Sequence, residues 1–234
     1  MTENKNNNWA LVFKKNIPDF LFPLIILSII LIAIRFFLWK TVSFNYLLWN
    51  ILLAFIPLVL SLIVLFQPKK GIINKIIFIV GLILWLLFIP NAPYLVTDII
   101  HLGEIKAVPV LFDTFLLFNT ALLGLVIFCL SLEHIEKIIL EKFSKRKTFL
   151  MTTLIILLIS FGMYLGRFAR FNSWDIFTNH QSLFGHIWGV INQTEAHVYL
   201  YTLLFFSFLF LSYQFWKLLK KRNDKYKKQK NNCF

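Results

Sequence analysis

Residues Phe44–Phe66 read FNYLLWNILLAFIPLVLSLIVLF, a run of 23 residues that contains no charged side chain. A run of about 20 apolar residues is long enough to cross the hydrocarbon layer of a bilayer as a helix. Because lipid offers the backbone no hydrogen-bond partners, a spanning segment must form an α-helix or part of a closed β-barrel. Barrel strands have about 10 residues and alternate in polarity, whereas this run is apolar on all sides. It therefore predicts a transmembrane helix.

Five further runs of the same kind lie along the chain, in the ranges Phe20–Leu38, Ile72–Ile89, Val108–Leu132, Phe149–Leu165 and Val198–Trp216. The chain is 59% hydrophobic and 15% charged, which is too little charge for a soluble domain of 234 residues. We predict an all-α fold, an integral membrane bundle of six transmembrane helices with short interfacial helices in the outer loops. Its expected parts are an N-terminal segment 1–19, a transmembrane domain 20–216 and a basic, disordered tail 217–234.

The positive charge is unevenly distributed along the chain. Of the 24 Lys and Arg residues, 19 lie in the N-terminal segment, in the tail, or in the segments after the second and fourth runs. Basic residues concentrate on the cytoplasmic side of membrane proteins, so both termini of this multi-pass protein are predicted to be cytoplasmic and the protein to reside in the cell membrane. The expected partners are the lipid bilayer and its anionic headgroups at the cytoplasmic face. The same distribution argues against nucleic-acid binding.

The sequence contains no recognisable metal or cofactor motif. Cys129 and Cys233 have no metal-type spacing, and His180, His186, Glu195 and His197 are too irregularly spaced to define a metal site. No H-E-x-x-H, G-x-S-x-G, phosphate-binding loop or dinucleotide fingerprint occurs. We therefore predict no metal and no cofactor.

The stretch Leu87–Glu104, LFIPNAPYLVTDIIHLGE, ends the third apolar run and collects polar side chains on the predicted outer face. Pro90 and Pro93 end the helix, because proline lacks an amide donor and displaces the residue before it from helical geometry. A new short helix would place Asp98 and His101 on one face. The carboxylate could orient the imidazole, or Asp98 could cap the helix while His101 lies at the interface.

A second polar stretch, Gly162–Asp175, reads GMYLGRFARFNSWD. Gly162 and Gly166 form a G-x-x-x-G pattern that permits close approach of a neighbouring helix. Arg167 and Arg170 could grip a carboxylate or phosphate of a ligand. Alternatively, they could neutralise aspartates within the protein.

Asp113 lies inside the fourth apolar run, where an ionisable group requires a partner. Arg167 or Arg170 is its expected mate. We predict that Asp98, His101 and Asp113 face Arg167, Arg170 and Asp175 in one partly buried cluster. Farther along, SLFGHIWGVI (182–191) has helical apolar spacing, which predicts a helix that lies in the membrane interface or covers the bundle as a lid.

Three segments together resemble an uncharacterised bacterial multi-pass membrane-protein family, domain of unknown function 1361. The segments are FIPNAPYLVTDIIHL, FDTFLLFNTALLGL and YLGRFARFNSWD, and the resemblance extends over about residues 48–215. It implies the same membrane architecture but supplies no reaction. The positions that match the pattern are Asn91, Pro93, Tyr94, Thr97, Asp98, His101, Asp113, Gly166, Arg167, Arg170, Asn172, Ser173, Trp174 and Asp175.

Three functional classes follow as hypotheses. The first is a binding or assembly protein of the envelope. The second is a membrane-embedded enzyme that acts on a lipid or envelope precursor, with His101 as its base, and the third is a small-solute transporter. The candidate catalytic residues are Asp98, His101 and Asp113, and the candidate binding residues are Asn91, Tyr94, Arg167, Arg170, Asn172, Trp174 and Asp175.

Overall fold

The computed structural model describes residues 16–40, 44, 46–68, 71–103, 108–193 and 196–232, and all regular structure within them is helical. Six helical segments are long and apolar enough to cross a membrane, so the protein is an all-helical multi-pass membrane protein, as predicted. These segments are α2 (Leu21–Trp39), α3 (Tyr46–Phe66), α4 with its continuation (Ile72–His101), α6 (Val110–Lys142), α7 (Lys145–Arg167) and α10 (Ala196–Asn232).

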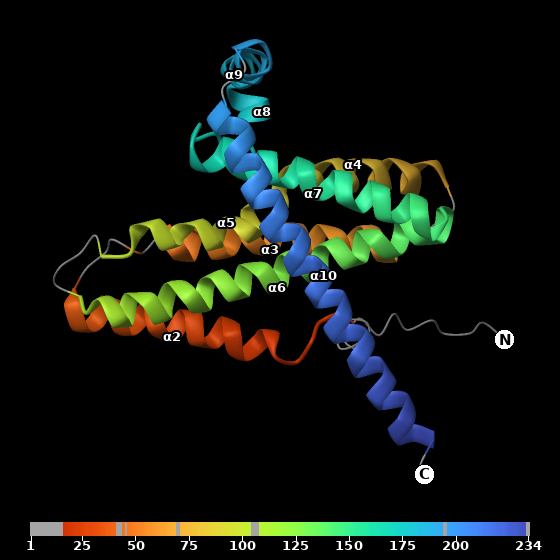
Figure 1. Ribbon diagram of the computed structural model, residues 1–234, viewed down its shortest axis with the longest axis horizontal. Coiled ribbons are helices and arrows are strands. Elements are labelled where there is room, and N and C mark those ends of the chain that lie inside the picture. The colour runs from red at the N-terminus through yellow and green to blue at the C-terminus, as the bar shows by residue number, and fades with distance from the viewer. Residues whose placement is uncertain are drawn as a thin grey trace.

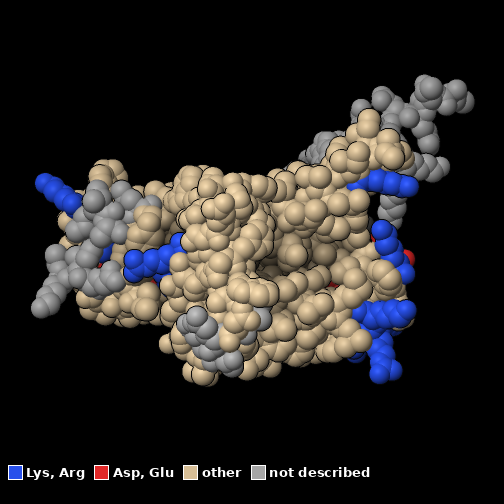
Figure 2. Space-filling model, turned by 90° about the horizontal axis from the view of Figure 1, so that it is seen from above, with Lys and Arg blue, Asp and Glu red and all other residues tan. Residues whose placement is uncertain are grey.

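Helix α6 is the central helix of the bundle and packs against α2, α3 and the short helix α5 (Asn91–Thr97) (Figure 1). Leu116, Leu123 and Ile127 on α6 are fully buried, whereas α4 leaves most of its apolar side chains exposed. In a membrane protein such exposed apolar side chains face the lipid. Figure 2 accordingly shows the Lys and Arg side chains toward the two ends of the bundle, with uncharged surface between them.

A buried hydrogen-bond chain ties three helices together. Trp85 of α4 donates through Nε1 to Ser131 Oγ of α6 at 2.7 Å, and this hydroxyl donates to the carbonyl oxygen of Pro57 in α3 at 3.0 Å. The surrounding apolar core offers these polar groups no other partners, so the two bonds hold α3, α4 and α6 together.

The third span is interrupted at Pro90, as the sequence predicted. The expected displacement of the residues before the prolines is not seen, because Ile89 keeps helical backbone angles (φ −60°, ψ −30°) and Pro93 lies inside the next helix. Helix α4 (Ile72–Phe88) ends two residues before Pro90, and the chain continues as α5 (Asn91–Thr97) and the 3-10 helix η1 (Asp98–His101). Asn91 donates to the carbonyl oxygen of Phe88 at 2.9 Å, which satisfies a backbone acceptor at the break. Asp98 begins η1, but no side chain caps it.

Glycines allow α5 to approach its neighbours closely. A Cβ atom on Gly124 of α6 would lie 2.3 Å from the carbonyl oxygen of Ala92, and one on Gly162 of α7 would lie 2.7 Å from Pro90 Cγ. At Gly166 the nearest atom would belong to the Tyr94 ring, at 3.2 Å. The G-x-x-x-G pattern therefore serves close packing, and its partner is the Pro90–Tyr94 segment.

Helix α10 crosses the other long helices obliquely and packs mainly along α7 (Figure 1). It continues to Asn232, so the segment 217–232 is helical in the structure, where the sequence analysis expected a disordered tail. The first turn of this segment is held by α6, because Lys217 pairs with Glu136 at 2.6 Å and Lys220 pairs with Glu133. Most of the N-terminal segment 1–19 lies outside the described residues.

Two short helices connect α7 to α10. They are α8 (Asp175–Thr178) and α9 (His180–Gln193), and α9 confirms the helix expected over 182–191. Leu183 and Val190 of α9 are buried, while Trp188 is 68% exposed. The helix thus packs one edge on the bundle and presents the other outward, and its depth relative to a bilayer stays a prediction.

Candidate functional site

A buried ion pair joins the broken third span to the end of α7. Arg167 Nη2 donates to Asp98 Oδ1 at 3.0 Å, and Asn50 Nδ2 of α3 donates to Asp98 Oδ2 at 3.1 Å. Asp98 is only 1% exposed. Both carboxylate oxygens are therefore satisfied by the protein, as a buried charge requires.

The other donors of Arg167 also contact the protein. Its Nε donates to Thr97 Oγ1 at 2.9 Å, and its Nη1 reaches Tyr94 Oη at 3.4 Å and lies 3.5 Å from His101 Nε2. The guanidinium carbon lies over the Tyr94 ring, 4.7 Å from the centroid. Of the two alternatives for Arg167, internal neutralisation of an aspartate is the one the geometry favours.

The partner predicted for Asp113 was wrong. Asp113 pairs with Arg35 of α2 through two bonds, Nε to Oδ1 at 2.8 Å and Nη2 to Oδ2 at 3.2 Å. The Arg35 guanidinium also lies 3.9 Å from the centroid of the Phe44 ring. α2 packs beside α6, whereas Arg167 belongs to α7 and is taken up by Asp98. The sequence carried a signal for Arg35, because a lone arginine in an apolar run requires a counter-charge.

Arg170 and Asp175 do not join the Asp98 cluster. Arg170 is exposed, with a left-handed backbone (φ 59°), and it leads the chain away from the end of α7. Asp175 accepts a hydrogen bond from the backbone N–H of Asn172 at 2.6 Å and another from Thr178 Oγ1 at 3.2 Å, and these bonds close a local turn. The single six-residue cluster expected from the sequence is therefore divided. Asp98, His101 and Arg167 lie together, and Asp113 has its own pair.

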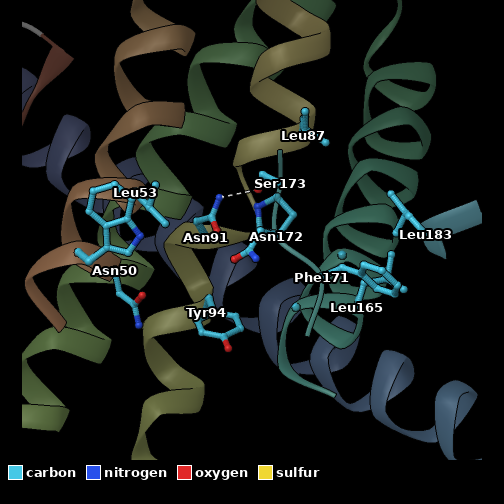
Figure 3. A pocket seen from close by; sticks show the side chains of 14 residues that line it. Asn50, Leu53, Leu87, Asn91, Tyr94, Leu165, Phe171, Asn172, Ser173 and Leu183 are labelled. Atoms are coloured by element: carbon cyan, nitrogen blue, oxygen red, sulfur yellow. Dashed lines mark hydrogen bonds between the residues drawn. The ribbon is translucent and has the colours of Figure 1, made fainter. Parts of the chain in front are cut away.

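A cavity of about 190 Å³ opens next to the Asp98–Arg167 pair, between α3, the α4–α5 break, α7 and the loop that follows α7 (Figure 3). Across it, Asn91 Nδ2 donates to Ser173 Oγ at 2.9 Å, the bond drawn in Figure 3. The lining residues are Trp49, Asn50, Leu53, Leu87, Pro90, Asn91, Tyr94, Gly162, Leu165, Gly166, Phe171, Asn172, Ser173 and Leu183. None of these side chains carries a charge.

The candidate binding residues from the sequence divide into two groups. Asn91, Tyr94 and Asn172 line the cavity, and Arg167 lies behind Tyr94. Trp174, Arg170 and Asp175 are not among its lining residues. Asn50 and Trp49 also line the cavity, although neither was among the site residues predicted from the sequence. Asn50 was detectable in principle, because an amide within an apolar run requires a hydrogen-bond partner.

The histidines on the predicted outer side lie in two separate places. His101 packs edge-to-face against Tyr46, with ring centroids 5.4 Å apart. The ring centroids of His186 and His197 each lie 6.5 Å from that of Tyr164. Within the part of the chain that the structure describes, no three His, Cys, Asp or Glu residues form a group that could hold a metal ion. Glu195 lies outside the described residues.

A second polar cluster lies toward the other end of α6. Glu133 and Glu136 contact α10 through Trp216, Lys217 and Lys220, and Tyr213 donates to Glu136. On the same part of α6, His134 Nδ1 lies 2.9 Å from Ser61 Oγ. These contacts fasten α10 and α3 to the central helix.

Comparison with known proteins identifies a family. Residues 49–213, well over half of the chain, match the family described as "Protein of unknown function (DUF1361)". No curated protein and no solved structure matches the chain. The match includes all fourteen residues that line the cavity, the Asp98–Arg167 pair and Asp113, while Arg35 lies before it. The chain belongs to the DUF1361 family.

Proposed function

We propose that this protein is a binding or assembly protein of the cell envelope, and that the cavity beside the Asp98–Arg167 pair holds a small uncharged polar group of its ligand. The observation that carries the proposal is that the charged side chains and the cavity lining are separate sets of residues. The charged side chains satisfy one another behind the cavity, and the cavity itself is lined by neutral hydrogen-bonding groups and aromatic rings.

Charge pairing supports a structural role for Arg167. Its guanidinium has partners on Asp98, Thr97 and Tyr94, so a ligand anion would have to displace contacts that are already made. If a ligand anion drew Arg167 away, Asp98 would remain as a buried carboxylate without its counter-charge, which is costly. The ion pair therefore fixes the shape of the α5–α7 junction on which the cavity depends.

The lining chemistry suits a neutral ligand. The side-chain oxygens of Asn50, Asn91 and Asn172 offer acceptors, and the Asn172 amide offers donors, because both N–H groups of Asn91 already bind Phe88 and Ser173. Trp49 and Tyr94 contribute aromatic surface. A concave site with a few polar groups on apolar walls is typical of small-molecule binding. Hydroxyl or amide groups are the ligand functions that match it.

The charge distribution of the sequence supports the placement of this site. The cavity lies at the end of the bundle opposite the Lys-rich segments, which the positive-inside rule assigns to the cytoplasm. In this orientation both termini are cytoplasmic, the cavity faces the outer side of the cell membrane, and the basic α10 end lies near anionic headgroups.

Binding can be tested by saturation-transfer NMR on the full chain in nanodiscs. The probes are methyl glucoside and N-acetylalanine amide as neutral molecules, and acetate and glucose 6-phosphate as anions. We expect transfer to at least one neutral probe and its loss in Asn91→Leu and Asn172→Leu, with Asn192→Leu as a matched control outside the cavity. Transfer to the anions alone, or no response to either cavity variant, would contradict the proposal.

A membrane-embedded enzyme is the second candidate, because His101 Nε2 lies 3.5 Å from Arg167 Nη1 and Arg167 in turn pairs with Asp98. Neither His101 nor Asp98 lines the cavity, which is why binding is preferred. If the protein is an enzyme, His101→Ala should abolish turnover of an envelope lipid in membrane extracts while the folded protein persists. A transport role is not proposed, because the cavity and its polar lining lie toward one end of the helices.

A further inference from the structure

We infer that the ligand of the cavity is a membrane lipid with an uncharged sugar headgroup, which enters sideways from the bilayer between α4 and α7. This inference rests on the proposed function and adds to it the class of ligand and its route. It combines the depth of the cavity along the helices, the exposed apolar side chains of α4 and α7 beside it, and the absence of charge among its lining residues.

The cavity lies at the depth where a lipid headgroup meets its acyl chains. Gly162 is five residues before the end of α7, which at about 1.5 Å per residue places it roughly 7–8 Å inside the helix end. Leu87 is in the last turn of α4, and Trp49 is in the first turn of α3, 54% exposed. Tryptophan is enriched at this boundary, since its ring is apolar and its N–H is polar.

The apolar side of the cavity continues toward the membrane core. Leu53, Leu87 and Leu165 form its walls on α3, α4 and α7. Helix α4 packs mainly against α3, and α7 packs mainly against α10. Helix α7 meets the end of the α4 span at Gly162, where a Cβ atom would lie 2.7 Å from Pro90 Cγ. Figure 2, seen from the side of α4, α7 and α9, shows the surface hollowed near the centre of the molecule.

Exposed aliphatic side chains follow both helices from the cavity downward. On α4 they include Ile76, Val80 and Ile83, and on α7 they include Leu154 and Leu158. An acyl chain can lie against such a surface without a cost in free energy, because these side chains are as apolar as the surrounding lipid chains. A lipid whose headgroup occupies the cavity would therefore keep its chains in the bilayer between the two helices.

The polar side of the cavity favours a sugar over a phosphate. A phosphate carries at least one negative charge and is normally bound by Arg or Lys, and none of the fourteen lining side chains is basic. Arg167 is engaged by Asp98, and exposed Arg170 is not among the lining residues. The side-chain oxygens of three asparagines can accept hydrogen bonds from sugar hydroxyls, and the Asn172 amide can donate to them. Trp49 and Tyr94 can contact the apolar faces of the sugar ring.

The test uses the full chain in nanodiscs and two photoreactive lipids with the same diazirine-bearing acyl chain. One is a monoglucosyl diacylglycerol, and the other is phosphatidylglycerol. We expect the glucolipid to label peptides of α4 and α7, with competition by unlabelled glucolipid. Asn172→Leu should reduce this labelling about tenfold, the effect of losing one or two hydrogen bonds, and Asn192→Leu should leave it unchanged. Because the Asn172 side chain is exposed, its replacement spares the core.

The outcomes separate this inference from the proposed function. Labelling by phosphatidylglycerol that falls equally in Asn172→Leu would overturn the sugar headgroup. Saturation transfer to methyl glucoside without specific labelling by the glucolipid would overturn the lateral lipid route while the neutral binding cavity stands. If Asn172→Leu alters neither labelling nor saturation transfer, both the inference and the proposed function fail.

Discussion

Replacing Arg35 with methionine should destabilise the protein strongly, because it removes one half of a fully buried ion pair. The side chains of Arg35 and Asp113 are each only 2% exposed, and the two bonds between them measure 2.8 and 3.2 Å. Methionine retains most of the length of the arginine stem, so the main change is the loss of the charge. Asp113 would then be a buried carboxylate without its ion-pair partner.

The expected cost can be worked out in two ways. Breaking a buried ion pair by removing one partner costs about 3–5 kcal/mol. Placing an unpaired charge in the middle of a membrane helix costs about 2.5–3.5 kcal/mol on insertion scales, and less toward the helix end. Asp113 lies in the first turn of α6, so a loss of about 3 kcal/mol in the free energy of unfolding is expected.

The assay is reversible unfolding in mixed micelles, with dodecyl sulfate as denaturant and circular dichroism as the signal. Lys137→Met is the matched control, because Lys137 pairs with Glu133 at 2.9 Å but its side chain is 45% exposed. An exposed pair of this kind contributes at most about 1 kcal/mol. The double variant Arg35→Met with Asp113→Leu should recover most of the loss, since no charge is then left buried. Equal costs for Arg35→Met and Lys137→Met would refute the reasoning.

Three further predictions concern the packing around the site. Arg167→Ala should cost about 3 kcal/mol, because Asp98 loses its counter-charge, and the same unfolding assay measures it; an additional Asp98→Asn change should restore part of the loss. Gly124→Ala should cost about 1–3 kcal/mol, because its Cβ would lie 2.3 Å from the Ala92 carbonyl oxygen, whereas Gly185→Ala, with open space around it, should leave the thermal midpoint unchanged. Glu133→Gln combined with Glu136→Gln should speed amide hydrogen exchange in 217–232, since both α6 partners of the α10 lysines are weakened; unchanged exchange there would mean that the tail is helical without them.

Much of the architecture could be predicted from local sequence. Each apolar run satisfies its own backbone hydrogen bonds as a helix, so the number of spans does not depend on how they pack. Pro90 likewise ended α4 by a local effect, because its ring removes an amide donor from the helix. The tail was the exception. Its composition suggested disorder, but carboxylates of α6, which lie about 80 residues earlier, hold its first turns as helix.

The sequence by itself determined which six runs are long and apolar enough to span a membrane, where the third run breaks, and that polar side chains collect beside that break. Only the tertiary structure decided which charges meet. Arg35 pairs with Asp113 across 78 residues, and Arg167 pairs with Asp98 across 69. The cavity forms where α3, the α4–α5 break, α7 and the loop after α7 come together. The physical reason is range: a helix is specified by neighbours within a few residues, whereas an ion pair or a cavity depends on which helices lie side by side.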